Sequence, residues 1–273
     1  MSAMPAHILE ELDDRYTLSS DQISFYRENG FIKLKQVLSP VVISYMDEVI
    51  SAEVDRFNTQ HIPMEKRDTY GKAFLQIMNL WTRSEAVREI VFSKRLARIA
   101  AELMGVRGVR MYHDQALYKE PGGGHTPWHA DQYYWPLETD KSVTVWMPLQ
   151  DTPLEYGPLE FSSGSYKLTT GRDKPIGDES QALLEETLRK EGYPLVVEPF
   201  DLGEVSFHAG WLFHRAGPNT TGKMRKVMTV IYIDQDMKLK APANQNQIAD
   251  WETWCPGAKV GEVIDTPLNP VIA

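Results

Sequence analysis

Apolar positions in the first third of the chain recur at helical spacing, which predicts a mainly helical region over residues 1–105. Ser20 can cap a first helix that stops at Asn29-Gly30, and a short strand over 31–34 follows. Ser39-Pro40 places a capping residue and a first-turn proline ahead of a second helix that runs to about Phe57.

A third helix is expected from about Glu85 to Met104, ended by Gly105. Its apolar residues follow one another at intervals that keep most of them on one helix face: Val87, Ile90, Val91, Leu96, Ile99 and Leu103.

After Gly105 the pattern changes to short runs rich in Val, Tyr, Phe and Trp, separated by Gly, Pro, Asp and Asn. Helices followed by strands indicate an α+β fold. Many short strands with turn signals favour a double-stranded β-helix, or jelly roll, with the N-terminal helices packed on one sheet. The predicted strand segments are 106–120, 142–150, 157–161, 195–199, 203–208 and 224–233.

The length of 273 residues suits one domain with a helical annex. We expect a jelly-roll core over 106–235, interrupted at about 166–194 by a polar insertion with a helix at 179–190. We expect the insertion to lie near one mouth of the barrel. The proline-containing tail, 236–273, is predicted to be irregular and held by Trp251 and Trp254.

Net charge and cysteine content exclude several classes of protein. A formal charge of -9 argues against nucleic-acid binding and gives no support for docking on an anionic membrane. Cys255 is the one cysteine, so neither a disulfide framework nor a cysteine-rich zinc site can form within the chain. The sequence shows no spanning apolar run and no secretory signal, so a cytoplasmic location is expected. The oligomeric state is left open.

Two histidines and one aspartate form the candidate metal site. In an extended segment His129 and Asp131, two residues apart, point to one face, and His214 follows more than 80 residues later. Two imidazoles and a carboxylate that leave coordination positions open suit iron(II). A His-X-Asp pair alone is weak evidence, because surface pairs of this kind are common. His208 competes with His214 for the ligand role, although a packed histidine is its more usual interpretation.

Arg225 follows His214 by eleven residues, at the entrance of a strongly apolar strand. An arginine buried there would need an anionic partner. Its planar guanidinium matches a carboxylate such as the distal one of 2-oxoglutarate. The alternative is that Arg225 lies beside Lys223 and Lys226 in a solvated turn.

An ordered set of motifs resembles the phytanoyl-CoA dioxygenase family of iron(II)/2-oxoglutarate oxygenases, over most of the chain. It begins in Leu18-Ser-Ser-Asp-Gln-Ile and the helix after Leu38-Ser-Pro. It continues through Trp128-His-Ala-Asp131, Val145-Trp-Met-Pro-Leu, Gly157-Pro-Leu-Glu-Phe, Gly164-Ser-Tyr-Lys, His214-Arg-Ala-Gly-Pro-Asn and Arg225.

The resemblance implies iron ligation by His129, Asp131 and His214 and anchoring of 2-oxoglutarate by Arg225. It also implies that Trp146 lines the co-substrate pocket and that Gln115 contacts co-substrate or substrate. The implied activity is O2-dependent hydroxylation of a small molecule with release of succinate and CO2. Desaturation or ring formation by the same oxidant stays open, as do a non-oxygenase metal enzyme and an inert jelly-roll binding protein.

Three positions depart from the family pattern. Ala216 stands where members often carry a Ser or Thr that touches the co-substrate, so that contact is missing or supplied elsewhere. Tyr156 replaces a frequent Asn, and Tyr166 replaces the usual His of the Gly-Ser-His-Lys turn. Asp131 is retained, whereas the halogenases of the family have a small residue there.

Candidate substrate contacts are the histidines and aromatic residues near the metal motif and two polar residues inside an apolar run. Each has a structural alternative, such as a packed core ring or a side chain that satisfies backbone groups. The candidates are His113, His125, Tyr133, Trp135, Trp211, Gln76 and Asn79.

Overall fold

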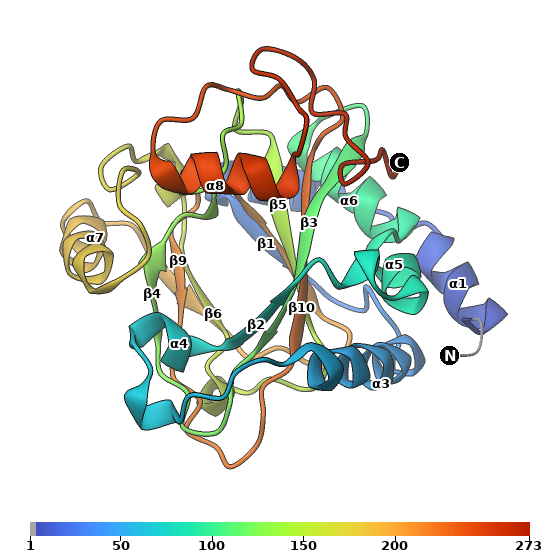
Figure 1. Ribbon diagram of the computed structural model, residues 1–273, viewed down its shortest axis with the longest axis horizontal. Coiled ribbons are helices and arrows are strands. Elements are labelled where there is room, and N and C mark those ends of the chain that lie inside the picture. The colour runs from blue at the N-terminus through green and yellow to red at the C-terminus, as the bar shows by residue number, and fades with distance from the viewer. Residues whose placement is uncertain (1–3) are drawn as a thin grey trace.

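Two antiparallel sheets face each other in the computed structural model, which describes residues 4–273 (Figure 1). The larger sheet has the strand order β1-β8-β5-β10-β3-β2 and the smaller sheet β4-β9-β6-β7. This arrangement confirms the predicted α+β fold with a double-stranded β-helix core. The strands are β1 (Phe31–Leu34), β2 (Leu75–Met78), β3 (Val109–Tyr118), β4 (Thr126–His129), β5 (Ser142–Pro148), β6 (Leu159–Ser162), β7 (Leu195–Val197), β8 (Val205–Ala209), β9 (His214–Ala216) and β10 (Val227–Asp234).

The N-terminal helices pack on the outer face of the six-stranded sheet and form the main hydrophobic core with it. Strand β5 shows how alternation divides its residues between two environments. Val143 and Val145 point into this core, whereas Thr144 and Trp146 face the space between the sheets. The helices concerned are α1 (Ala6–Asp13), α2 (Ser20–Asn29), α3 (Pro40–Phe57), α5 (Glu85–Val91) and α6 (Lys94–Met104).

The prediction of one helix over 85–104 was wrong, because Ser93 separates α5 from α6. Its hydroxyl accepts a hydrogen bond from the backbone N–H of Leu96 at 3.3 Å and donates one to the carbonyl of Leu12 at 2.7 Å. A serine used in this way starts a new helix. The cap of α2 was also misplaced by one residue, since Ser19 forms a capping box with Gln22.

The tail was predicted to be irregular, but it contains α8 (Gln245–Trp254). Asn244 caps this helix by accepting a hydrogen bond from the N–H of Gln247 at 2.9 Å. Helix α8 lies across one end of the barrel, at the top of Figure 1. The short helix α4 (Thr69–Ala73) lies beside the same interior space and leads into β2.

Helix α7 (Asp178–Lys190) lies within the predicted insertion and packs outside the four-stranded sheet. Leu184 and Leu188 pack in one hydrophobic cluster with Trp128. The Gln181 side chain accepts a hydrogen bond from the backbone N–H of Trp128 at 2.9 Å. From the whole insertion, only Ile176 reaches the interior cavity among the described residues. Helix α8 lies across the end of the barrel, and the insertion reaches the cavity through Ile176.

A β-bulge in β3 changes which residues face the interior. Met111 pairs with Tyr232 and His113 pairs with Ile231, so Tyr112 is left without a partner. Met111 therefore belongs to the helix-covered core, whereas His113, two residues later, lines the cavity. Across residues 4–273, no helix has the length and apolar character that crossing a membrane requires.

Candidate active site

A cavity of about 580 Å³ lies between the two sheets. Arg225 lines its inner end, and β2, α4 and α8 contribute residues to its outer end. Between these ends lie His129, Asp131 and His214. The three residues that the sequence motif predicted as metal ligands therefore share one cavity.

Strand pairing brings the two histidines together although they are far apart in sequence. His129 ends β4, His214 begins β9, and the two are direct partners in the antiparallel ladder. Their ring centres are 4.2 Å apart. Asp131 begins a 3-10 turn (Asp131–Tyr133) after β4. One ligand atom from each of the three residues lies within 4.8 Å of the others.

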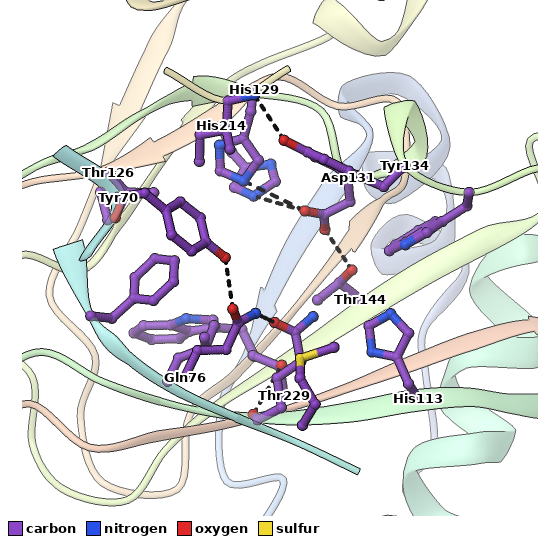
Figure 2. A pocket seen from close by; sticks show the side chains of 18 of the residues that line it. Tyr70, Gln76, His113, Thr126, His129, Asp131, Tyr134, Thr144, His214 and Thr229 are labelled. Atoms are coloured by element: carbon purple, nitrogen blue, oxygen red, sulfur yellow. Dashed lines mark hydrogen bonds and ion pairs between the residues drawn. The ribbon is translucent and has the colours of Figure 1, made fainter. Parts of the chain in front are cut away.

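The backbone orients both imidazoles. Nδ1 of His129 lies 2.8 Å from the carbonyl oxygen of Pro127, and Nδ1 of His214 lies 3.1 Å from that of Leu212. A proton on each Nδ1 leaves a lone pair on each Nε2, the usual arrangement of a metal-bound histidine. The Nε2 atoms lie 3.5 and 3.7 Å from Oδ1 of Asp131 (Figure 2). This donor set fits iron(II).

The second oxygen of Asp131 is held by other side chains. Thr144 donates a hydrogen bond to Oδ2 at 2.8 Å, and Nε2 of His208 lies 3.3 Å from the same oxygen. Oδ1 is thereby turned toward His129 and His214. His208 is thus placed as a neighbour of the carboxylate and is not one of the three grouped donors. Thr144 was missed from the sequence, where it appears only as a threonine in an apolar strand.

Charge states at the cluster suit a cation. Burial and the neighbouring His129 hold the pKa of His214 well below its usual range, which keeps the imidazole neutral. Burial alone would raise the pKa of Asp131. The interactions with His214, His129 and His208 outweigh this effect and hold that pKa well below the usual value. A neutral imidazole and an ionised carboxylate are the metal-binding forms of these groups.

Arg225 is only 2% exposed, which excludes the solvated turn. One terminal nitrogen donates to the carbonyl of Gly157, Nε has no partner, and the guanidinium lies 5.6 Å from the ring centre of Trp146. Burial lowers the pKa of Arg225 to about 9. No carboxylate among the described residues lies within ion-pair distance of it. An unpaired buried guanidinium that lines a cavity fits an anionic ligand.

A second buried basic side chain, Lys119, lies next to Arg225 and was not singled out from the sequence. Its ammonium donates to the carbonyls of Gly124 at 2.8 Å and Gly217 at 2.6 Å. Burial and the charge of Arg225 lower the pKa of Lys119 to about 6. The backbones of Lys119 and Arg225 form an isolated antiparallel bridge. Of these two basic groups, Arg225 keeps its charge at neutral pH and makes the inner end of the cavity electropositive.

Gln115 and Gln76, both predicted site residues, form a hydrogen-bonded chain along the cavity wall. The Gln76 amide donates to Gln115 Oε1 at 2.6 Å and accepts from the Tyr70 hydroxyl at 2.8 Å (Figure 2). His113 and Trp135 also line the cavity, with ring centres 6.1 Å apart.

Four residues that were predicted to contact substrate do not line this cavity: His125, Tyr133, Trp211 and Asn79. His125 is exposed on the glycine-rich loop and is not among the residues that line the cavity. Tyr133 is buried, and its hydroxyl accepts a hydrogen bond from Asn246 at 3.0 Å. Trp211 packs under Arg172, whose guanidinium lies 4.5 Å from its ring centre.

Asn79 has a structural role. It adopts a left-handed conformation with φ of 48°, and its side-chain oxygen accepts a hydrogen bond from the N–H of Asp114 at 3.2 Å. It satisfies the backbone where the chain leaves β2, which is a common use of asparagine.

One face of α8 supplies the cavity residues that were not predicted. These residues recur at helical spacing, but they mix polar, small and aromatic types, so they carry no amphipathic signal. They are Asn246, Ala249, Asp250, Thr253 and Trp254.

Comparison with known proteins identifies the family. The phytanoyl-CoA dioxygenase (PhyH) family model matches residues 26–227. A probable alpha-ketoglutarate-dependent hypophosphite dioxygenase of Stutzerimonas stutzeri is 21% identical over 80% of this chain and 79% of its own length. An ectoine dioxygenase of Bordetella parapertussis is 24% identical over 71% of this chain and 63% of its own length.

Solved structures share the fold. The alpha-ketoglutarate-dependent carbocyclase SnoK from nogalamycin biosynthesis has a TM-score of 0.76 and 22% identity, covering 94% of this chain and 97% of SnoK. EctD from S. alaskensis, solved with 2-oxoglutarate and 5-hydroxyectoine, has a TM-score of 0.66 and 19% identity over 85% of this chain and 83% of EctD. The protein belongs to the phytanoyl-CoA dioxygenase family and is an iron(II)- and 2-oxoglutarate-dependent dioxygenase.

Proposed function

We propose that His129, Asp131 and His214 bind the iron, that Arg225 binds the distal carboxylate of 2-oxoglutarate, and that the enzyme hydroxylates a small organic molecule. One observation carries this proposal. Three convergent donor atoms and a buried arginine without a carboxylate partner line the same cavity. A metal enzyme that did not use an anionic co-substrate would have no need for that arginine.

The three ligands leave coordination positions open, as 2-oxoglutarate and O2 require. When bound, iron with 2-oxoglutarate and O2 supplies the oxidant, and the overall reaction converts a C–H bond to C–OH with release of succinate and CO2. The protein positions the reactants. Thr144 and His208 hold one oxygen of Asp131 and leave the other for the metal.

The electropositive inner end orients the co-substrate. Arg225 presents a planar fork to a carboxylate, and Trp146 forms the wall beside it. Ala216 lacks the hydroxyl that relatives often use, but Thr126 is its direct partner across the ladder and lines the cavity. We infer that the Thr126 hydroxyl makes this contact. Gln115 lies further out, between co-substrate and substrate.

The outer end excludes water from the reacting atoms. Helix α8 lies across this end of the barrel, and Trp254 and Tyr70 bring aromatic rings to it. Excluding water protects a strong oxidant from unproductive reduction.

The test is anaerobic titration with iron(II) and 2-oxoglutarate, followed by a metabolite screen for substrate-stimulated succinate formation in the presence of O2. Product mass separates the outcomes. A gain of one oxygen atom supports hydroxylation, and a loss of two hydrogens indicates desaturation or ring closure. Turnover without O2 and 2-oxoglutarate would identify a different metal enzyme. Failure to bind iron would indicate an inert binding protein.

A further inference from the structure

The outer end of the cavity contains a buried carboxylate with no basic partner. Asp250, on α8, is 8% exposed and lines the cavity. Its Oδ2 accepts a hydrogen bond from the hydroxyl of Tyr112, the bulge residue of β3. Its Oδ1 makes no hydrogen bond with the described residues, yet this oxygen is not fully buried. Oδ1 therefore retains accessible surface on a residue that lines the cavity.

Carboxyl groups line this end of the cavity, whereas a guanidinium lines the inner end. Arg225 is the one lysine or arginine among the described residues that line the cavity, and it lies at the inner end. Asp68, at the start of α4, adds a second carboxylate to the outer end. Burial raises the pKa of Asp250 to about 8, so this carboxyl group holds a proton near neutral pH until a cation binds beside it and stabilises the ionised form.

Aromatic rings surround the region next to Asp250. The ring centre of His113 lies 5.4 Å from that of Trp254 and 6.1 Å from that of Trp135. Burial lowers the pKa of His113 to about 3, so this imidazole is neutral and does not neutralise Asp250. Aromatic faces together with a carboxylate form a common recognition site for a cationic nitrogen.

We propose that the substrate is an organic amine whose protonated nitrogen binds Asp250 beside the rings of Trp254 and Trp135. This proposal rests on the proposed function, because it assigns the outer end of the same cavity to the molecule that is oxidised. The ammonium would give the buried carboxylate the partner that it lacks. Anionic substrates, coenzyme A thioesters and phosphorylated metabolites among them, would meet two carboxylates and no compensating cation.

The test compares three probes that share a ring and differ in charge: 2-phenylethylamine, 2-phenylethanol and 3-phenylpropanoate. Binding to the anaerobic protein loaded with iron(II) and 2-oxoglutarate is measured by calorimetry. The amine is expected to bind at least about tenfold more tightly than the alcohol, a difference of about 1.4 kcal/mol. The carboxylate probe is expected to bind weakest.

Asp250→Asn keeps the shape and an oxygen that can accept from Tyr112, but removes the charge. It is expected to weaken amine binding about tenfold and alcohol binding less than twofold. Tyr112→Phe keeps the charge and is expected to retain the preference for the amine. Thermal unfolding of each variant establishes that it is folded.

Equal affinities for amine and alcohol, no binding of the amine, or equal losses for both probes in Asp250→Asn would overturn the proposal. Iron and 2-oxoglutarate titrations of the same protein report on the proposed function separately. If both bind while the probes show no charge preference, the amine proposal alone fails. If neither iron nor 2-oxoglutarate binds, the proposed function itself fails. The affinities of the three probes for the unloaded protein then still show whether the cavity prefers an amine.

Discussion

The two ends of the cavity differ in their ionisable groups and in the elements that build them. The inner end and the metal cluster come from β4, β5, β9 and the entrance of β10, where neighbouring strands fix each residue. The outer end comes from α4, the edge strand β2 and one face of α8. The grouped metal donors are thus held by paired strands, whereas the outer end is built from helices and an edge strand.

Removal of a metal ligand should give the largest effect. His214→Ala leaves two donors, so we expect loss of measurable iron binding and a fall in succinate formation on the order of 10³-fold or more. Iron is measured by anaerobic titration. His125→Ala is the matched control, because His125 is exposed and lies outside the cavity. A comparable loss in that control would show that the site has been assigned to the wrong histidines.

Arg225→Met tests the inner end alone. It removes a charge-assisted pair with the co-substrate, so we expect the dissociation constant of 2-oxoglutarate to rise about 100-fold, on the scale of 1.5–3 kcal/mol for one such hydrogen bond and more for two. Iron affinity should stay close to that of the wild type. Without 2-oxoglutarate the melting temperature should hold or rise, because a buried charge without a carboxylate partner is removed. Unchanged 2-oxoglutarate affinity would refute this role.

Thr144→Val tests whether the hydrogen bond to Asp131 matters for the metal. Valine has nearly the same shape but cannot donate to Oδ2, so iron affinity should fall about tenfold. Thr144→Ser keeps the hydroxyl and should restore most of the affinity. If valine and serine behave alike, packing at this position and not the hydrogen bond sets the iron affinity.

How far the sequence predicts this site depends on which end is considered. The spacing of His129 and Asp131 follows from extended backbone, and the motifs around His214 and Arg225 placed both correctly in the cavity. The role of Arg225 could be predicted because a charged side chain at the entrance of an apolar strand is costly to bury without a partner. The relation between β4 and β9 needed the family resemblance, since strands of three or four residues carry little pattern.

Many residues of the outer end could not be assigned from the sequence, for three physical reasons. The face of α8 carries mixed chemistry and therefore has no hydrophobic period. The bulge at Tyr112 reverses the alternation of β3, which no count of positions along the strand reveals. Asn79 was considered for the cavity because it is polar within an apolar run, but its side chain satisfies the backbone of Asp114.

The smallest expected effect concerns the hydrogen-bonded chain between the two ends. Gln76 accepts from Tyr70 and donates to Gln115, so Gln76→Leu leaves both without a partner. A hydrogen bond of this kind contributes about 1 kcal/mol, which corresponds to roughly a fivefold rise in KM for the substrate. The dissociation constants of iron and 2-oxoglutarate should change less than about twofold, since the charged groups proposed to bind them, Asp131 and Arg225, make no hydrogen bond with Gln76. A parallel loss of 2-oxoglutarate affinity would mean that the hydrogen bonds from Tyr70 through Gln76 to Gln115 couple the outer end to the inner end. The two ends would then not act independently.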